Sequence, residues 1–262
     1  MRKYGSLVFS SLYVSFKKTR AYNMEFMMML VHVVFSFAFV FLFWSAILYN
    51  FSFPSYWTAS ELYFFAAIVL LADAIGEIFF PLKLLPSVVV SGDLSQYLIR
   101  PVNTLSLFLM ANMNIIAIVE RIGVSIVAIV IVAISQEIAL SAPTFILALL
   151  LMITGIVAYQ ILYATFSLTS FWFGEVSFFR DTIFEVGDFK RYPLDVFSKW
   201  LQKALTFILP VSLIVFFPAS LILGKICISW TILFIYSLVF ILSNVVFKIV
   251  WKAGLRRYEA NS

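Results

Sequence analysis

Residues 26–48 read FMMMLVHVVFSFAFVFLFWSAIL, an apolar run without Asp, Glu, Lys or Arg in which His32 is the one titratable side chain. A helix rises about 1.5 Å per residue, so about 20 residues cross a hydrocarbon core of about 30 Å. The run is long enough to span a bilayer, and it is longer than the apolar part of a cleavable signal peptide, about 7–15 residues. We predict a first membrane-spanning helix over 26–48.

The whole chain has the composition of a protein solvated by lipid. Of its 262 residues, 63% are hydrophobic and 12% are charged, which is about half the charged share of a soluble domain. The net charge of +5 does not indicate nucleic-acid binding, because Lys and Arg stand in short groups beside apolar runs. One cysteine, Cys227, and one histidine leave no disulfide, no His/Cys metal site and no catalytic triad. We predict an all-α, polytopic membrane protein with no catalytic residue and no metal.

Further apolar runs place the other spans. Those with clear boundaries are 60–80, 104–135 (most strongly 119–135), 143–170 and 229–250. Before the first span, residues 4–20 carry apolar side chains at helical spacing, which predicts an amphipathic helix lying in the membrane interface. No composition change divides the chain, so residues 1–262 are expected to form a single membrane domain.

The distribution of Lys and Arg predicts the orientation. Residues 1–25 carry five and residues 248–262 carry four, whereas the loops 49–59 and 136–142 carry none. Short cytoplasmic segments hold the excess of these residues. Both termini are therefore predicted to be cytoplasmic, which requires an even number of spans, and six are expected.

The stretch 171–228 admits two maps. Hydropathy favours a fifth span over 204–224, because Arg180, Asp181, Glu185 and Asp188 would each cost about 2.5–3.5 kcal/mol at the bilayer centre. The other map places the fifth span at 173–190 and folds 191–228 as an external re-entrant segment. The residues themselves leave both maps open.

His32, Asp73 and Glu77 are the candidates for an intramembrane polar site. Asp73 and Glu77 are four residues apart and share one helix face. Such carboxylates suggest an ion or proton site, and hence an ion-coupled secondary transporter as one function. Their position near the predicted cytoplasmic end of 60–80 favours a boundary pair instead. The chain has no glycine-rich phosphate-binding loop, so any ATP it uses is hydrolysed on another chain.

Three motifs carry a resemblance to a known family. They are SGDLSQYLIRPVN (91–103), YPLDVFSKWLQKALTFILPVSLIVFFPASLILGK (192–225) and WKAGLRRYEA (251–260). In this order, between spans of this length, they resemble the bacterial ABC type-2 permeases. The resemblance implies an exporter subunit with six spans in the bacterial cytoplasmic (inner) membrane. It also implies a second permease, identical or related, and a separate ATP-binding cassette ATPase that holds ATP and magnesium, with no cofactor in this chain.

The resemblance also assigns roles along the chain. It favours 173–190 as the fifth span and makes 82–103 the cytoplasmic coupling segment that contacts the ATPase. In that segment Ser91, Gly92 and Asp93 are a helix-start signal and Arg100-Pro101 ends the helix. Leu94, Tyr97 and Leu98 are predicted to share one face of it. The expected coupling residues are Gly92, Asp93, Leu94, Tyr97, Leu98, Arg100 and Pro101.

Overall fold

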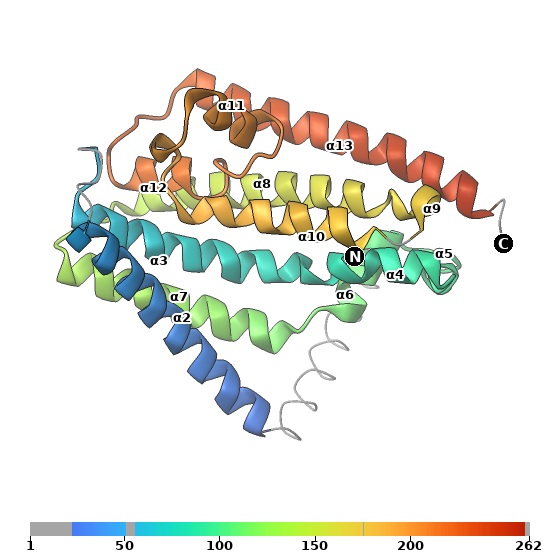
Figure 1. Ribbon diagram of the computed structural model, residues 1–262, viewed down its shortest axis with the longest axis horizontal. Helices are drawn as coiled ribbons and strands as arrows, with labels where there is room; N and C mark the ends of the chain where they lie inside the picture. The colour runs from blue at the N-terminus through green and yellow to red at the C-terminus, as the bar shows by residue number, and fades with distance from the viewer. Residues whose placement is uncertain (1–22, 51–55, 175, 260–262) are drawn as a thin grey trace.

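The computed structural model describes residues 23–50, 56–174 and 176–259, and these residues form helices and connecting segments without a strand (Figure 1). The long helices are α2 (Asn23–Asn50), α3 (Ala59–Gly76), α7 (Ile115–Ser135), α8 (Ala142–Ser167) and α13 (Trp230–Glu259). The short ones are η1 (Glu77–Leu84), α4 (Leu85–Val90), α5 (Ser95–Leu98), α6 (Thr104–Asn112), α9 (Ser170–Phe173), α10 (Ser177–Val186), η2 (Gly187–Arg191), η3 (Leu194–Val196), α11 (Lys199–Phe207) and α12 (Phe216–Ile222). The predicted interfacial helix 4–20 lies outside the described residues.

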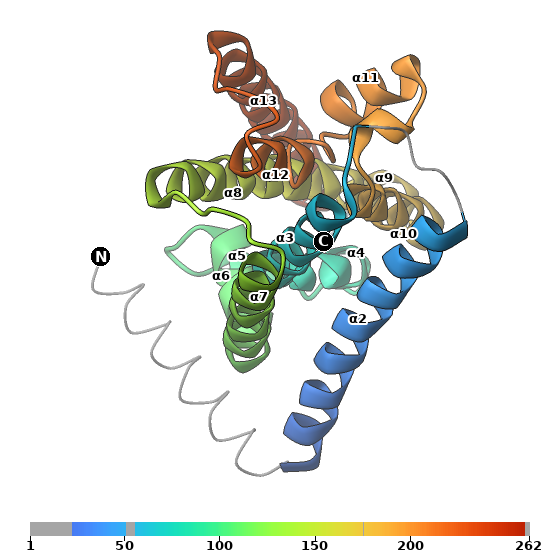
Figure 2. The same cartoon turned by 90° about the vertical axis from the view of Figure 1, so that its left-hand side faces the viewer.

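The long helices run side by side, and α2 leaves the bundle at an oblique angle (Figures 1 and 2). Within the described part of the chain, four helical stretches are long and apolar enough to cross a membrane, namely Ala59–Val90, Ile115–Ser135, Ala142–Phe173 and Trp230–Tyr258. Helix α2, with 28 residues, contains the predicted first span. The prediction of an all-α, polytopic membrane protein is confirmed.

Different short helices lie at the two ends of the bundle (Figure 1). At one end, which we call the α12 end, α3, α8 and α13 begin, and α12 lies beside them. At the other, the α5 end, lie α4, α5 and α9 together with the last turn of α13. The last helix is longer than the predicted span 229–250, because it continues to Glu259 through the basic tail.

The second span is longer than predicted. The predicted span ends at residue 80, before a polar-apolar mixture with three prolines; in an ordinary α-helix a proline removes a backbone N–H donor and clashes with the preceding turn. The chain instead tightens into the 3₁₀ helix η1 around Pro81 and resumes as α4, where Pro86 occupies a first-turn position that needs no donor. The result is one continuous stretch from Ala59 to Val90, which we call the α3 rod.

The third predicted span, 104–135, is two helices. Asn103 caps α6 by accepting a hydrogen bond from the Ser106 amide at 3.0 Å. Met113 is extended, and Asn114 then caps α7 by accepting from the Ala117 amide at 3.2 Å. Short polar side chains of this kind start helices because they satisfy first-turn N–H groups. The spanning stretch is therefore 115–135, close to the strongly apolar part of the predicted run.

Neither candidate for the fifth span is an uninterrupted helix of spanning length. Within 173–190, α10 has ten residues and passes into the 3₁₀ turn η2. The run 204–224 is divided between α11 and α12. From α9 the chain turns back through α10 toward the α12 end (Figure 1). The charged residues of this segment explain why the helix is interrupted. The tighter η2 turn places the Lys190 ammonium group beside Asp73 of α3, and not in lipid.

The α3 rod is the centre of the packing. Helix α3 lies against α2, α7, α8 and α12, and its buried side chains include Leu62, Phe64, Phe65, Ala67 and Ile68, all fully shielded. The outer helices keep large apolar side chains exposed, as a lipid solvent requires. On α13 these include Phe234, Ile241, Leu242 and Ile249.

The backbones of α8 and the segment before α12 approach closely at Gly155. A Cβ atom there would lie 2.6 Å from the carbonyl carbon of Leu213. The oxygen of the same carbonyl accepts a hydrogen bond from the Tyr236 hydroxyl of α13 at 2.6 Å. The absence of a side chain at position 155 thus lets α8, the 209–215 segment and α13 pack together.

Gly155→Ala is expected to destabilise the fold by about 1–3 kcal/mol, because a methyl group would overpack against backbone. Gly123→Ala on α7 is the matched control, since nothing lies within 4 Å of its Cβ position and alanine favours a helix. Thermal unfolding of the detergent-purified protein measures both. Equal melting temperatures for the two variants would contradict the close approach.

Candidate functional site

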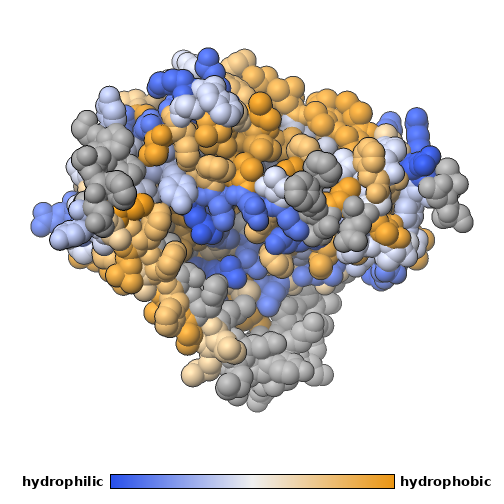
Figure 3. Space-filling view, in the orientation of Figure 1, coloured by the Kyte–Doolittle hydropathy of each residue, from blue (hydrophilic) through white to orange (hydrophobic). Residues whose placement is uncertain are grey.

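A cleft of about 620 Å³ opens beside the middle of the α3 rod. Counting from Ala59, Asp73 is residue 15 and Glu77 residue 19 of this 32-residue stretch, so the pair is central and not at the end of its span as predicted. Figure 3 shows a hydrophilic, recessed patch across the middle of a largely apolar face. We call this the central cleft; its charged lining residues are Asp73, Glu77, Lys83, Arg121, Asp188, Lys190 and Arg191.

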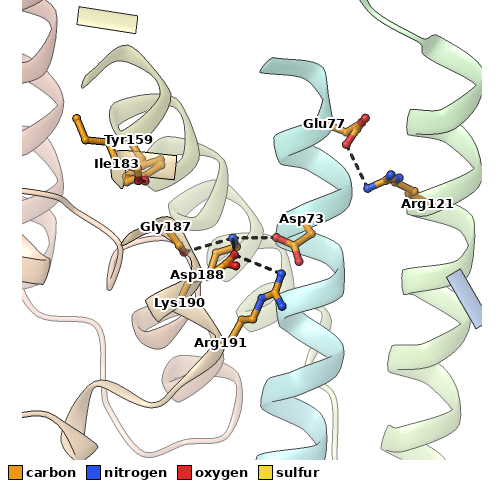
Figure 4. A network of polar contacts seen from close by, with 9 residues as sticks. All are labelled: Asp73, Glu77, Arg121, Tyr159, Ile183, Gly187, Asp188, Lys190 and Arg191. Carbon is orange, nitrogen blue, oxygen red and sulfur yellow. Dashed lines mark hydrogen bonds and ion pairs between the residues drawn. The ribbon is translucent and has the colours of Figure 1, made fainter. Parts of the chain in front are cut away.

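Lys190 is the hub of the first polar cluster (Figure 4). Its ammonium group lies 2.9 Å from the Asp73 carboxylate and 3.7 Å from that of Asp188, and it donates to the Gly187 carbonyl at 3.3 Å. Arg191 pairs with Asp188 at 3.2 Å. The Lys190 side chain is 15% exposed, so its pair with Asp73 joins η2 to the α3 rod in a largely shielded position.

Glu77 and Arg121 form a second ion pair, 3.2 Å apart, between the α3 rod and α7 (Figure 4). The Nε atom of Arg121 is buried without a hydrogen-bond partner. Both carboxylate oxygens of the adjacent Glu120 are buried and unpartnered as well. Because an unpaired buried polar atom costs about 1–3 kcal/mol, the unused Nε donor of Arg121 indicates a place where an acceptor on a ligand would find a partner. Glu120 is not among the residues that line the cleft.

The position of η2 depends on its fit to α8. The Tyr159 hydroxyl donates to the Ile183 carbonyl at 2.5 Å. A Cβ atom at residue 187 would lie 2.7 Å from that hydroxyl, so glycine lets η2 lie against α8. Close by, the Lys83 ammonium sits 3.8 Å above the Phe184 ring. These contacts show how a charged segment is accommodated beside spanning helices.

The remaining lining of the central cleft is mostly apolar. Phe35 and Phe39 of α2 and Phe79, Phe80 and Phe184 contribute rings. A cavity lined by both charged groups and aromatic rings is suited to binding an amphipathic molecule. Among the described residues no three His, Cys, Asp or Glu side chains group as metal ligands. His32 lies on α2, but its side chain is outside the described set.

Some of the predicted coupling residues face the helix bundle, and others face outward. Residues 82–90 belong to the α3 rod, and residues 91–103, which we call the tip segment, protrude at the α5 end. Leu94 is fully buried, and Tyr97 packs edge-on against Phe108 with ring centroids 5.4 Å apart. Leu94 and Tyr97 therefore anchor the tip segment to the bundle. Ile99, which is 82% exposed, and its exposed neighbours Arg100 and Pro101 face outward.

The end of α13 holds the tip segment in place. The Tyr258 hydroxyl donates to the Gly92 carbonyl at 2.5 Å. Gly92 has φ +84°, a conformation that side chains other than glycine rarely adopt. The Tyr258 ring packs edge-on against Phe171 of α9 at 5.9 Å. The two motifs 91–103 and 251–260 are thus in direct contact.

The two carboxylates Asp73 and Glu77 are indicated by the sequence, but Lys190, the base that pairs with Asp73, is not among the predicted site residues. The signal that could have found it is the mixture of acidic and basic residues over 180–191, matched to the acid at 73 in a neighbouring span. Charges of both signs in apolar surroundings require partners.

Asp73→Asn combined with Lys190→Met should recover part of the stability that each single change loses. Lys190→Met leaves the Asp73 carboxylate unpaired, and Asp73→Asn leaves Lys190 with only its longer contact to Asp188, so we expect a coupling energy of about 0.5–3 kcal/mol. Denaturation of the four purified proteins gives this value. The pair Asp188–Arg191, about half exposed on both sides, is the control, with an expected coupling below about 1 kcal/mol. Additive effects at Asp73 and Lys190 would contradict the pairing.

Comparison with known proteins places the chain in a family. A family model described as ABC-2 family transporter protein matches residues 34–262, which is most of the chain. No curated protein and no solved structure matches. The match includes all three motifs on which the resemblance rested, and it confirms the predicted family. The chain belongs to the ABC-2 family of transporter proteins.

Proposed function

We propose that this chain is an exporter permease, driven by ATP hydrolysis on a separate ATP-binding cassette ATPase. Members of the ABC-2 family are transport components of ABC transporters, and the chain is a multi-pass membrane protein. We also propose that it works with a second permease, identical or related. The chain would lie in a bacterial cytoplasmic membrane with both of its termini in the cytoplasm. ATP and magnesium belong to the ATPase in this proposal. Family membership favours it over the ion-coupled alternative.

The observation that carries the proposal is the tip segment. It presents Ile99, an apolar side chain exposed to 82%, at the α5 end of the bundle, where the basic end of α13 also lies. An exposed apolar residue beside Arg100 suits a protein partner in the cytoplasm. Of the expected coupling residues, Leu94 is buried and Tyr97 and Leu98 pack against the bundle, whereas Arg100 and Pro101 are exposed. We therefore assign the ATPase contact to Arg100 and Pro101, and add Ile99 to it.

The tip segment is mechanically continuous with the central cleft. The α3 rod ends at Val90, and residue 91 begins the tip segment, so a displacement of the tip acts on the helix that carries Asp73 and Glu77. In the proposed mechanism, closure of the ATPase pair moves the tip segments. The permease then changes between states with different substrate affinity, without forming any bond itself.

Ile99→Asp is expected to weaken co-purification of the co-expressed ATPase by about tenfold or more, a cost of at least about 1.4 kcal/mol. Leu140→Asp, at an exposed position in the loop between α7 and α8 at the α12 end, is the control and should leave co-purification unchanged. Membrane levels of both variants are compared by immunoblot. Retention of the ATPase by Ile99→Asp would overturn the assignment of the contact.

Tyr258→Phe should reduce the amount of substrate moved per ATP while hydrolysis continues. The change removes the hydroxyl that fixes the Gly92 carbonyl, worth about 0.5–1.5 kcal/mol, and keeps the ring that packs on Phe171. Tyr49→Phe, at an 89% exposed tyrosine, serves as the control. Transport and ATPase rates measured in the same proteoliposomes give the ratio, and a ratio equal to that of the control would count against a positioning role.

A further inference from the structure

We propose that the central cleft binds an amphipathic molecule with an acidic headgroup, such as a single carboxylate or phosphate. The binding site is inferred from the cleft itself, whereas the assignment of the bound molecule as a transport substrate rests on the proposed function.

The pairing of the acids in the cleft favours an anion over a cation. Four cationic side chains and three carboxylates line the cleft, and Asp181 and Glu185 of the adjoining groove offset the charge of Lys83. Each carboxylate already lies within 3.2 Å of a base: Asp73 beside Lys190, Glu77 beside Arg121 and Asp188 beside Arg191. A cationic headgroup would have to displace one of these bases, whereas an anion can join them. In a low-dielectric site the difference is amplified.

Two arginines offer hydrogen bonds to such an anion. A guanidinium group has five N–H donors in a planar fork that matches carboxylate and phosphate oxygens. Arg121 uses Nη1 on Glu77, and its Nε is buried without a partner. Arg191 is 49% exposed and shares Asp188 with Lys190. An acidic oxygen placed in the cleft would satisfy donors that the protein leaves unused.

The location of the acid within the cleft is further limited by its neighbours. Asp181 and Glu185 line a smaller groove that adjoins the cleft and shares Lys83, Phe184 and Asp188 with it. The potential near Lys83 is therefore lowered by two additional carboxylates. The headgroup is accordingly assigned to the part of the cleft away from that groove, which Arg191 of η2 and Arg121 of α7 line from opposite sides of α3 (Figure 4).

The aromatic wall supplies a site for an apolar tail. Phe35 and Phe39 of α2 line the cleft while remaining 70% and 67% exposed, so they border both the cleft and the lipid-facing surface. Helix α2 diverges from the bundle on this side (Figure 2). The volume of about 620 Å³ lies within the range of small-molecule sites, about 300–1,000 Å³. A molecule with its head on the bases and its tail on these rings would bury both parts.

The test is a binding titration of the full chain in nanodiscs, without ATPase. Cys227, the single cysteine of the chain and exposed, carries a fluorophore for thermophoresis. The probes are dodecyl phosphate, dodecyltrimethylammonium and inorganic phosphate. Dodecyl phosphate should bind at least about tenfold more tightly than either of the others. Equal binding of the cationic amphiphile overturns the acidic headgroup, and equal binding of inorganic phosphate overturns the apolar tail site.

Variants locate the site. Arg191→Gln should weaken dodecyl phosphate binding about tenfold, Arg191→Lys should restore most of it, and Lys203→Gln on the exposed face of α11 should have no effect. Equal affinity of Arg191→Gln and wild type would overturn the proposal. The melting temperature of each variant is measured alongside. If Arg191→Gln fails to fold, the affinity of Arg191→Lys is compared with that of the wild type instead. Since no ATPase is present, failure here leaves the ATPase contact intact, and loss of that contact leaves this binding unchanged.

Discussion

The Asp73–Lys190 ion pair, 2.9 Å long, is the interaction on which the arrangement of the central cleft depends. Residues 177–191 are too charged to face lipid and too short, as one ten-residue helix and a 3₁₀ turn, to cross the bilayer alone. They are accommodated because the Asp73 carboxylate of the α3 rod pairs with the Lys190 ammonium group of η2. The pairing keeps α10 against the bundle, and the same charges form the polar side of the cleft.

The α3 rod connects the central cleft with the tip segment. Its middle carries Asp73 and Glu77, and its end passes directly into the tip segment. Pro81, which would kink an ordinary helix, is absorbed by the 3₁₀ geometry of η1. Because Tyr258 fixes Gly92 from α13, movement at the tip would reach both the cleft-lining helix and the last spanning helix. The geometry thus supports the proposed coupling of a separate ATPase to the central cleft.

Much of the fold could be predicted from run length and charge, and the misses have local physical causes. The apolar runs at 26–48, 143–170 and 229–250 all lie in long helices, because lipid solvation leaves few alternatives. The break at Met113-Asn114 depends on a side-chain cap, and the continuation past Pro81 depends on 3₁₀ geometry; neither alters hydropathy. Lys190 was missed because its partner is distant in sequence. Leu94, Tyr97 and Leu98 pack against the same core cluster, and a four-residue helix does not reveal from its sequence that this shared face is buried and not exposed to a partner.

The central claim is that residues 177–191 pack within the helix bundle against the α3 rod, with the Phe184 ring 3.8 Å from the Lys83 ammonium. The most direct test is photo-crosslinking in intact membranes from benzoylphenylalanine placed at position 184, followed by peptide mapping. The account predicts crosslinks within the same chain to the η1 region, residues 77–84. Crosslinks to the ATPase or to other cytoplasmic proteins, with none to η1, would show that this segment is an exposed loop and would contradict the account.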